Sequence, residues 1–366
     1  MARLCLLANA ASSHTEKWAS ELAHRGWDVE IISFLPADIP RVKVHIVPPV
    51  SGKKADVIFR QHWIAQRVRS LEPDLVHAHY ASSFGLLGAL AGVHPLLVSA
   101  WGSDVFAFPR KSILHRHLLE WTLKQADVLC STSHIMAQEM RKYVSADQPI
   151  EVIPFGVDVR RFAPPEPESQ KAHSGGAPTT ESQMGEPVVF GVAKHLQPVY
   201  GIDVLLRAFS ELESRRPGQA LLRIAGDGPE WRRLTSLAKR LGVNDQVDWL
   251  GLIRNQDVAG FYQGLDVVVV PSHQESFGVT ALEASACGRP IIASHVGGLP
   301  EVVIHGETGI LVPPGDASAF SQAMESLLLS PRERERLGHA GRNFVLEHYD
   351  WLENVSKMEE VYRRLV

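Results

Sequence analysis

The sequence has few cysteines, no long uninterrupted apolar run and no strong excess of charge of one sign. Its 366 residues include three cysteines, Cys5, Cys130 and Cys287, which stand far apart without a Cys-x-x-Cys pair. A disulfide framework or a cysteine zinc site therefore has no basis, and a reducing cytoplasm is the predicted location. The net charge of −4 argues against a strongly basic nucleic-acid surface. We therefore predict no nucleic-acid partner.

The apolar runs are too short or too broken to span a membrane. Residues 4–8 form a short apolar run after Arg3, which is too short for a signal-peptide core and predicts a first β-strand instead. The longest apolar stretch, residues 84–100, contains three glycines and the pair His94-Pro95. These breaks predict a helix, a turn and a buried strand.

Apolar runs rich in valine, isoleucine and leucine alternate with polar or glycine breaks and helical periods along most of the chain. Near-continuous apolar strands alternating with helices are typical of parallel sheets covered on both faces. At roughly 100 to 200 residues per domain, the length favours two such domains. The predicted strands lie at residues 28–34, 74–79, 94–100, 126–131, 150–154, 187–193, 220–226, 247–251, 265–272 and 289–294.

One segment breaks this pattern. Residues 163–187 contain no valine, no isoleucine and no aromatic residue, but several prolines and many small or polar residues. Because such a composition cannot form a core, we predict a flexible linker between a domain of residues 1–162 and a domain of residues 188–348. The first domain is the more basic of the two. Ligands of doubly wound sheets bind beyond the carboxyl ends of the strands, which predicts a site in the cleft between the domains.

The most informative motif is "PSHQESFGVTALEASACGRP" at residues 271–290, which follows an apolar strand. Seven residues separate Glu275 from Glu283. A helix that begins near Ser276 or Phe277 would place Glu275 at its mouth and Glu283 two turns in. The free amides of Phe277, Gly278 and Val279 would then point at a diphosphate, with a carboxylate at each end for sugar hydroxyls. Two glutamates alone favour a plainer interpretation, in which Glu275 is a loop residue and Glu283 a solvated helix position.

Residues 271–316 as a whole resemble the donor-binding segment of the family 4 retaining glycosyltransferases of the GT-B fold. The Glu, seven residues, Glu spacing is followed in order by "GGLPE", "GETG" and "VPPGD", and "RIAGDGPEW", "YGIDVLLRAF" and the C-terminal "YDW" extend the likeness over most of the chain. The resemblance implies two Rossmann-like domains facing across a cleft. It also implies a C-terminal helix, residues 349–366, that packs back towards the N-terminal domain.

The resemblance implies roles for several residues of the second domain. Glu275 would contact the donor sugar, Glu283 the ribose hydroxyls, and the backbone around Leu252 and Ile253 the base. The family commonly has an arginine and, five residues on, a lysine that grip the diphosphate. Here Lys194 or His195 takes the first place and Val199 or Tyr200 the second. Lys194 is therefore the predicted cation for the leaving group, and the second cation is missing.

The first domain gives weaker signals at the ends of its strands. Trp101 stands where the family usually has a sugar-contacting histidine; a tryptophan stacks on sugars but exchanges no proton. His79 is predicted at a polar cleft edge and shares a strand face with His77; a metal site is the alternative, but it would need a third ligand. Asp104 either caps a helix or binds a hydroxyl, and His14 either reaches the cleft or follows a cap at Ser13.

The predicted function is retaining transfer of a hexosyl or N-acetylhexosaminyl group from a UDP- or GDP-linked sugar to a glycan or lipid-linked hydroxyl acceptor. By analogy with the family's range, the pathway would be bacterial cell-surface polysaccharide or glycolipid synthesis. No cofactor and no metal is predicted, because the sequence has no Asp-x-Asp for a metal-clamped diphosphate. Residues 111–124 combine apolar and basic side chains, so peripheral contact with the inner face of the cell membrane and packing against the sheet both stay open.

The sequence leaves three alternative functions to compare with this prediction. A catalytically silent relative would bind nucleotide or glycan without turnover, in line with Trp101 and the missing cation. A sugar-nucleotide epimerase would need acid and base residues around the donor sugar, which Trp101 does not supply. A dinucleotide dehydrogenase would need Gly-x-Gly-x-x-Gly after a strand, and "GDGPEW" lacks the third glycine.

Overall fold

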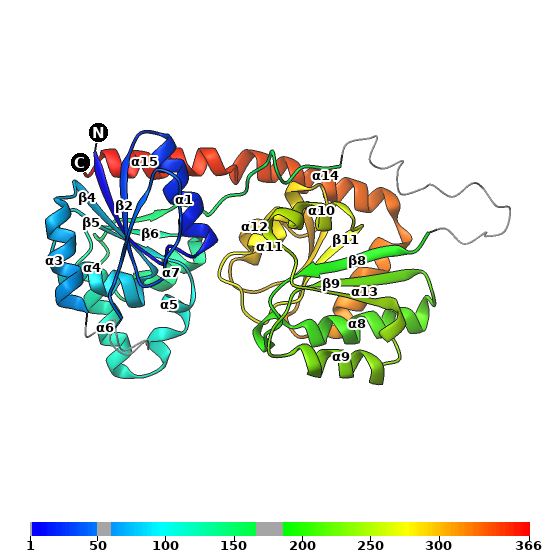
Figure 1. The fold of residues 1–366 in the computed structure, drawn as a ribbon. Helices are drawn as coiled ribbons and strands as arrows, with labels where there is room; N and C mark the ends of the chain where they lie inside the picture. The colour runs from blue at the N-terminus through cyan, green and yellow to red at the C-terminus, as the bar shows by residue number, and fades with distance from the viewer. Residues whose placement is uncertain (1, 50–59, 166–185) are drawn as a thin grey trace. The chain divides into compact units, whose positions relative to one another are not determined.

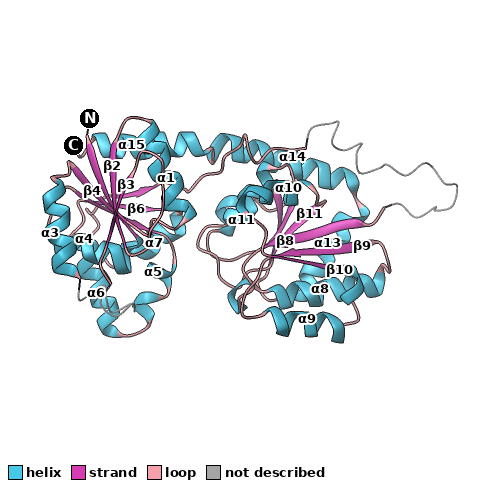
Figure 2. Ribbon diagram, in the orientation of Figure 1, coloured by secondary structure: helices cyan, strands magenta, loops and turns pink. Residues whose placement is uncertain are grey.

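The computed structural model describes residues 2–49, 60–165 and 186–366. The chain forms two compact units, drawn in Figures 1 and 2. Unit 1 consists of Met1–Phe155 and Leu352–Val366, and unit 2 of Gly156–Trp351. The chain therefore passes from one unit to the other twice. The first passage precedes the segment predicted as the linker, residues 163–187, most of which lies outside the described residues, so that linker stays a prediction.

Unit 1 is built on a seven-stranded parallel sheet with the order β3-β2-β1-β4-β5-β6-β7. The strands are β1 (Arg3–Leu7), β2 (Asp28–Ser33), β3 (Lys43–Ile46), β4 (Leu75–His79), β5 (Leu96–Ala100), β6 (Val128–Ser131) and β7 (Ile150–Val152). The helices are α1 (Ser13–His24), α3 (Gln61–Leu71), α4 (Leu86–Ala91), α5 (Ser103–Phe106), α6 (Ile113–Lys124), α7 (His134–Arg141) and α15 (Trp351–Arg363).

Unit 2 repeats the plan with a six-stranded parallel sheet in the order β10-β9-β8-β11-β12-β13. Its strands are β8 (Val188–Ala193), β9 (Ala220–Ala225), β10 (Val247–Gly251), β11 (Val267–Val270), β12 (Ile291–Ser294) and β13 (Gly309–Val312). Its helices are α8 (Ile202–Arg215), α9 (Trp231–Arg240), α10 (Val258–Gln263), α11 (Val279–Ala286), α12 (Leu299–Val302), α13 (Ala317–Leu329) and α14 (Pro331–His348). The predicted α/β class with two doubly wound sheets is confirmed.

The strand order places a topological switch point in each sheet. In unit 1 the chain builds outward from β1 in one direction and then from β4 in the other, and in unit 2 the same happens at β8 and β11. At such a point the loops after two neighbouring strands diverge and leave a crevice at the carboxyl ends, where ligands of this fold class bind. In unit 2 the loops that diverge in this way are those after β8 and β11.

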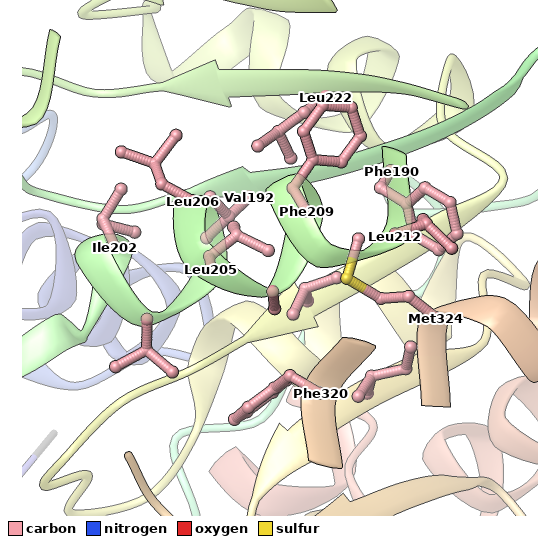
Figure 3. Packing of buried hydrophobic residues seen from close by; sticks show 14 of the residues in the cluster. Phe190, Val192, Ile202, Leu205, Leu206, Phe209, Leu212, Leu222, Phe320 and Met324 are labelled. Carbon is pink, nitrogen blue, oxygen red and sulfur yellow. The ribbon is translucent and has the colours of Figure 1, made fainter. Parts of the chain in front are cut away.

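The core of unit 2 holds these loops on a rigid base. Helix α8 presents Ile202, Leu205, Phe209 and Leu212 at spacings of three and four residues, so that they form one stripe. Figure 3 shows this stripe packed against Phe190, Val192 and Leu222 of the sheet and Phe320 and Met324 of α13. Burying each large apolar side chain contributes roughly 1.5–3 kcal/mol. The start of α8, which follows the β8 loop, is thereby anchored.

The C-terminal helix α15 packs on unit 1, as predicted. Glu359 is buried and accepts hydrogen bonds from Arg25 Nη1 and Trp27 Nε1, each at 2.9 Å. Tyr362 is fully buried, with its hydroxyl 2.6 Å from Nδ1 of His77. Because these partners come from opposite ends of the sequence, the last helix completes the core of the first unit.

Candidate functional site

Lys194 and Glu275 meet at the switch point of unit 2. Lys194 directly follows β8, and Glu275 lies in the loop after β11, the neighbouring parallel strand. The Nζ atom of Lys194 lies 2.8 Å from Oε2 of Glu275, and each side chain is 13% exposed. The two residues predicted to act at the diphosphate and the donor sugar are thus paired in the structure, although 81 positions separate them.

The surroundings of this ion pair are polar and lead to helix α11. Ser272 Oγ donates to the same carboxylate oxygen of Glu275 at 3.2 Å. The ammonium of Lys194 also lies 3.5 Å from Oγ1 of Thr280, in the first turn of α11. The lysine therefore bridges the loop carboxylate and the start of a helix, where the backbone amides carry partial positive charge.

Helix α11 begins later than predicted. Its first residue is Val279, and Gly278 before it has a φ of 116°, which a helix cannot accommodate. Phe277 is 3% exposed, its ring 5.9 Å from that of Tyr349. The expected start near Ser276 or Phe277 is therefore wrong, because the glycine turns the chain and the phenylalanine anchors it. Glu283 is the fifth residue of the helix, not two turns in.

This correction changes which amides are available. The first turn of α11 contains Val279, Thr280 and Ala281, and no side chain caps its start within the described residues. The amide of Val279 remains among the predicted groups, while Phe277 lies outside the helix. The N-terminus still faces the Lys194–Glu275 pair through Thr280, so an anion held at this helix would also lie near the ammonium.

Glu283 is oriented by a residue that the sequence analysis missed. Tyr262 of α10 is 1% exposed and lies near Glu283 and Thr280. Burial and the nearby Glu283 charge raise the pKa of Tyr262 well above its ordinary value, so the phenol stays neutral. The Glu283 carboxylate, itself half-buried, thus has a fixed neutral partner. A tyrosine inside an apolar helix gives no sequence signal of such a role.

Two adjacent glycines allow the Glu275 loop to pack closely against the segment before α12. The amide of Gly298 donates to the carbonyl of Glu275 at 3.0 Å. A Cβ atom on Gly297 would lie 1.8 Å from that same carbonyl oxygen. Every other residue type has a Cβ atom and would clash there. The two glycines of the "GGLPE" motif therefore allow close packing against the backbone that carries Glu275.

Ile253 lies at the same edge of the sheet but further from the ion pair. It follows β10, two strands away from β8, and is half-buried beside the exposed Leu252. Strand β9 lies between β10 and β8, and the loop after it packs on the backbone of Lys194. A Cβ on Gly226 in this loop would lie 1.9 Å from the lysine carbonyl oxygen. The "GDG" motif thus serves close packing here, and contact of Ile253 with a base stays a prediction.

The corresponding edge of unit 1 carries a cluster of rings. His79 at the end of β4 lies with its ring 4.6 Å from that of Trp101, and His14 of α1 stacks on Phe155 at 4.3 Å. Trp101 meets Phe155 edge-on at 5.3 Å, which closes the group. The structure therefore brings the predicted residues His14 and His79 together with Trp101, and adds Phe155 from the end of the unit's first segment.

The histidines of this cluster are neutral. Burial lowers the pKa of His79 to about 3 and, with a smaller contribution from Lys17, lowers that of His14. Within the described part of the chain, Nδ1 of His79 is buried without a hydrogen-bond partner, as is Oγ1 of Thr132. Both residues line a narrow recess of about 10 Å³ that Trp101 and Phe155 also line. The recess offers aromatic faces and unused polar atoms, but no charge from its histidines.

The second histidine of β4, His77, is structural. It is buried between Tyr362, 2.6 Å from Nδ1, and Ser99, 2.7 Å from Nε2. Over the described residues, no group of three or more His, Cys, Asp or Glu side chains is arranged to hold a metal ion.

Asp104 is fully buried below the cluster. Its carboxylate accepts hydrogen bonds from the amides of Ala81 and Gly102, each at 2.7 Å, and of Trp101 at 3.2 Å. Burial raises the pKa of this carboxyl group, and the amide hydrogen bonds oppose the rise. Its contacts are those of a residue that holds backbone, and hydroxyl binding by Asp104 stays a prediction.

Helix α6 exposes part of its apolar face. Ile113 and Leu114 are 67% and 71% exposed, and Trp121 on the same helix is 40% exposed. Basic side chains, Lys111 and Arg116, are exposed beside them. Packing against the sheet therefore does not account for the apolar side chains in the first turn of α6. None of the helices in the described ranges is both long and apolar enough to cross a bilayer.

Family models match most of both units of the chain. The family model described as "Glycosyl transferases group 1" matches residues 180–344, and "Glycosyl transferase 4-like" matches residues 3–133. The D-inositol 3-phosphate glycosyltransferase of Actinosynnema mirum is 34% identical to this chain, with 91% of this chain and 88% of the relative covered.

Solved structures show the same fold. Sucrose-phosphate synthase from Thermosynechococcus elongatus superposes with a TM-score of 0.83 at 23% identity, covering 100% of this chain and 99% of its own. Anabaena HepE in complex with UDP and glucose gives a TM-score of 0.81 at 19% identity, with both chains fully covered. By these family and structural matches, the chain belongs to the family 4 glycosyltransferases of the GT-B fold and is a glycosyltransferase that uses a nucleotide-sugar donor.

Proposed function

We propose that the chain transfers a hexosyl or N-acetylhexosaminyl group from a UDP-linked sugar to a hydroxyl group of a glycan or small polyhydroxylated acceptor, with retention at the anomeric carbon. The observation that carries this proposal is the Lys194–Glu275 pair beside the start of α11. The proposed nucleotide is uridine-based because HepE was solved with UDP and glucose. The proposed acceptor class includes phosphorylated polyols because the 34%-identical relative is named for inositol 3-phosphate.

The proposed chemistry uses groups of unit 2. The diphosphate would lie at the first turn of α11 and take the ammonium of Lys194, which stabilises negative charge as the sugar–phosphate bond breaks. Glu275 would then accept hydrogen bonds from hydroxyls of the transferred sugar, and Glu283, held by Tyr262, from the ribose. The acceptor hydroxyl would attack from the side of the leaving phosphate, which takes its proton.

The Lys194–Glu275 ion pair would keep the site without an uncompensated charge before the donor binds. In the structure each charge neutralises the other, so neither is left uncompensated in a site that is mostly shielded from water. A donor that presents phosphate oxygens to Lys194 and hydroxyls to Glu275 satisfies both partners at once. A ligand with only one of these features would leave the other charge unpaired, which favours nucleotide sugars over free sugars.

On unit 1 we propose that the ring cluster binds the acceptor. Trp101 and Phe155 offer apolar faces of the kind on which sugar and polyol rings stack, and His79 offers an unused nitrogen. We also propose peripheral membrane contact through Ile113 and Leu114 of α6, since both are exposed next to basic residues. Sedimentation with anionic vesicles tests it: an Ile113→Ser, Leu114→Ser variant should bind less than the unaltered protein.

A panel of UDP- and GDP-sugars tests the function. We expect UDP-sugars to raise the melting temperature more than GDP-sugars, and mass spectrometry of the best donor with inositol phosphate and glycan acceptors to detect a product larger by one sugar. Stabilisation without any product would favour a silent binder. Conversion of the donor in the absence of acceptor would favour an epimerase. No stabilisation by any nucleotide sugar would overturn the proposal.

A further inference from the structure

The ammonium of Lys194 is held by an aromatic ring as well as by a carboxylate. Its Nζ atom lies 4.7 Å from the centroid of the Tyr200 ring and 2.8 Å from Oε2 of Glu275. Ammonium groups are attracted to the face of an aromatic ring at this distance, more strongly where water is excluded. The side chain of Lys194 is 13% exposed, so the ring acts on a largely desolvated charge.

The Tyr200 ring is carried on a rigid turn. Tyr200 ends a 3-10 turn, Pro198–Tyr200, and Gly201 follows at a φ of 63°. A Cβ on Gly201 would lie 2.1 Å from the carbonyl oxygen of Pro271, so the turn touches the start of the Glu275 loop. The next residue, Ile202, opens α8 and is anchored in the core (Figure 3).

A second backbone contact joins the same two loops. The amide of His273 donates to the carbonyl of Val199 at 2.8 Å, one residue before Tyr200. Two backbone contacts therefore join the loop that carries the ring to the loop that carries Glu275. These contacts limit the movement of the Tyr200 loop relative to the Glu275 loop.

The ring and the carboxylate differ in what they do to the charge. Glu275 neutralises the ammonium, whereas an aromatic ring attracts it and leaves its full charge available to an anion. We propose that Tyr200 is a positioning residue that keeps the Lys194 ammonium directed at the diphosphate of the bound nucleotide. This inference rests on the proposed function, because it assigns the diphosphate to Lys194.

The face of the ring, and not its hydroxyl, is the required feature. We therefore expect Tyr200→Phe to keep kcat and donor KM within about twofold of the unaltered enzyme. Tyr200→Leu should lower kcat about fivefold, because the lysine then loses one of the groups that hold its ammonium while bond cleavage generates charge. Steady-state kinetics with the best donor of the panel provides the measurement, and melting temperatures of both variants show whether they fold.

A double-mutant cycle separates positioning of Lys194 from a general packing effect. The readout is the affinity for free UDP by calorimetry, which all variants allow without turnover. Tyr200→Leu should weaken UDP binding about fivefold in the unaltered background and leave it unchanged in a Lys194→Ala background. Tyr200→Met serves as the second variant if the leucine variant does not fold.

The outcomes distinguish this inference from the proposed function. Equal losses from Tyr200→Leu in both backgrounds, or a phenylalanine variant as weak as the leucine one, would overturn the role of the ring. Lys194→Ala with undiminished UDP affinity would instead overturn the assignment of the diphosphate to Lys194, and with it the proposed function.

Discussion

The carboxyl edges of the two sheets have the same topology and opposite chemistry. In unit 2 the edge at β8 and β11 holds a lysine and a glutamate paired at 2.8 Å. In unit 1 the edge at β1 and β4 holds aromatic rings and the neutral histidines His14 and His79. A switch point therefore provides a crevice but does not determine what binds in it. The side chains at the loop ends decide that.

The contrast fits two kinds of ligand. A diphosphate needs amides and a cation, because its charge must be balanced where water is excluded. The ring of a polyol acceptor would use aromatic faces and hydrogen-bonding atoms, and His79, Trp101 and Thr132 line a recess that has both. Under the proposed function, the charged edge of unit 2 would bind the donor and the aromatic edge of unit 1 the acceptor.

The largest expected effect concerns the charged edge. Lys194→Ala and Glu275→Ala should each lower turnover at least tenfold, because both contacts strengthen as the sugar–phosphate bond breaks. Steady-state kinetics with the best donor measures this loss. Lys239→Ala, an exposed lysine near the end of α9, is the matched control and should leave turnover unchanged. Unchanged kinetics in both site variants would remove the proposed site from unit 2.

The neutral edge should make the protein sensitive to acid. Burial lowers the pKa of His79 to about 3 and that of His77 well below its ordinary value of about 6.5. Between these values the unfolded chain binds more protons than the folded one, so stability is lost as pH falls below about 6.5. Each histidine should cost roughly 1 kcal/mol between pH 7.5 and 5.5.

Urea titrations of the unaltered protein and of His79→Phe at these two pH values provide the measurement. The variant cannot take up a proton at this position in either state. Its free energy of unfolding should therefore fall less on acidification, by roughly 1 kcal/mol. An identical pH dependence in the two proteins would show that His79 does not titrate differently on unfolding.

The smallest expected effect concerns acceptor binding. Trp101→Leu should raise the acceptor KM about threefold, because one ring face is lost, and leave UDP affinity unchanged. Initial rates at varied acceptor concentration and calorimetry with UDP measure the two quantities. Trp121→Leu on α6 is the matched control with a soluble acceptor. A loss of UDP affinity in Trp101→Leu would contradict the assignment of the donor to unit 2 alone.

Much of the donor side could be predicted from the sequence, because its signals are local. The strand before Pro271, the spacing of Glu275 and Glu283 and the lysine after an apolar strand are all visible in short stretches. The start of α11 was placed too early, since the sequence does not show that Gly278 takes a φ of 116°. Tyr200 and Tyr262 were missed as partners, because ring-to-ammonium and phenol-to-carboxylate contacts join different loops and helices.

The sequence by itself determined the class of fold, the family and the residues with charge to offer, because periodicity and motif order are properties of neighbouring positions. Only the tertiary structure decided which of these residues meet. Lys194 reaches Glu275 because β8 and β11 are neighbours in the sheet, and His77 reaches Tyr362 because the last helix closes the first unit. Such contacts arise from strand order and core packing, which bring together side chains that the chain itself keeps far apart.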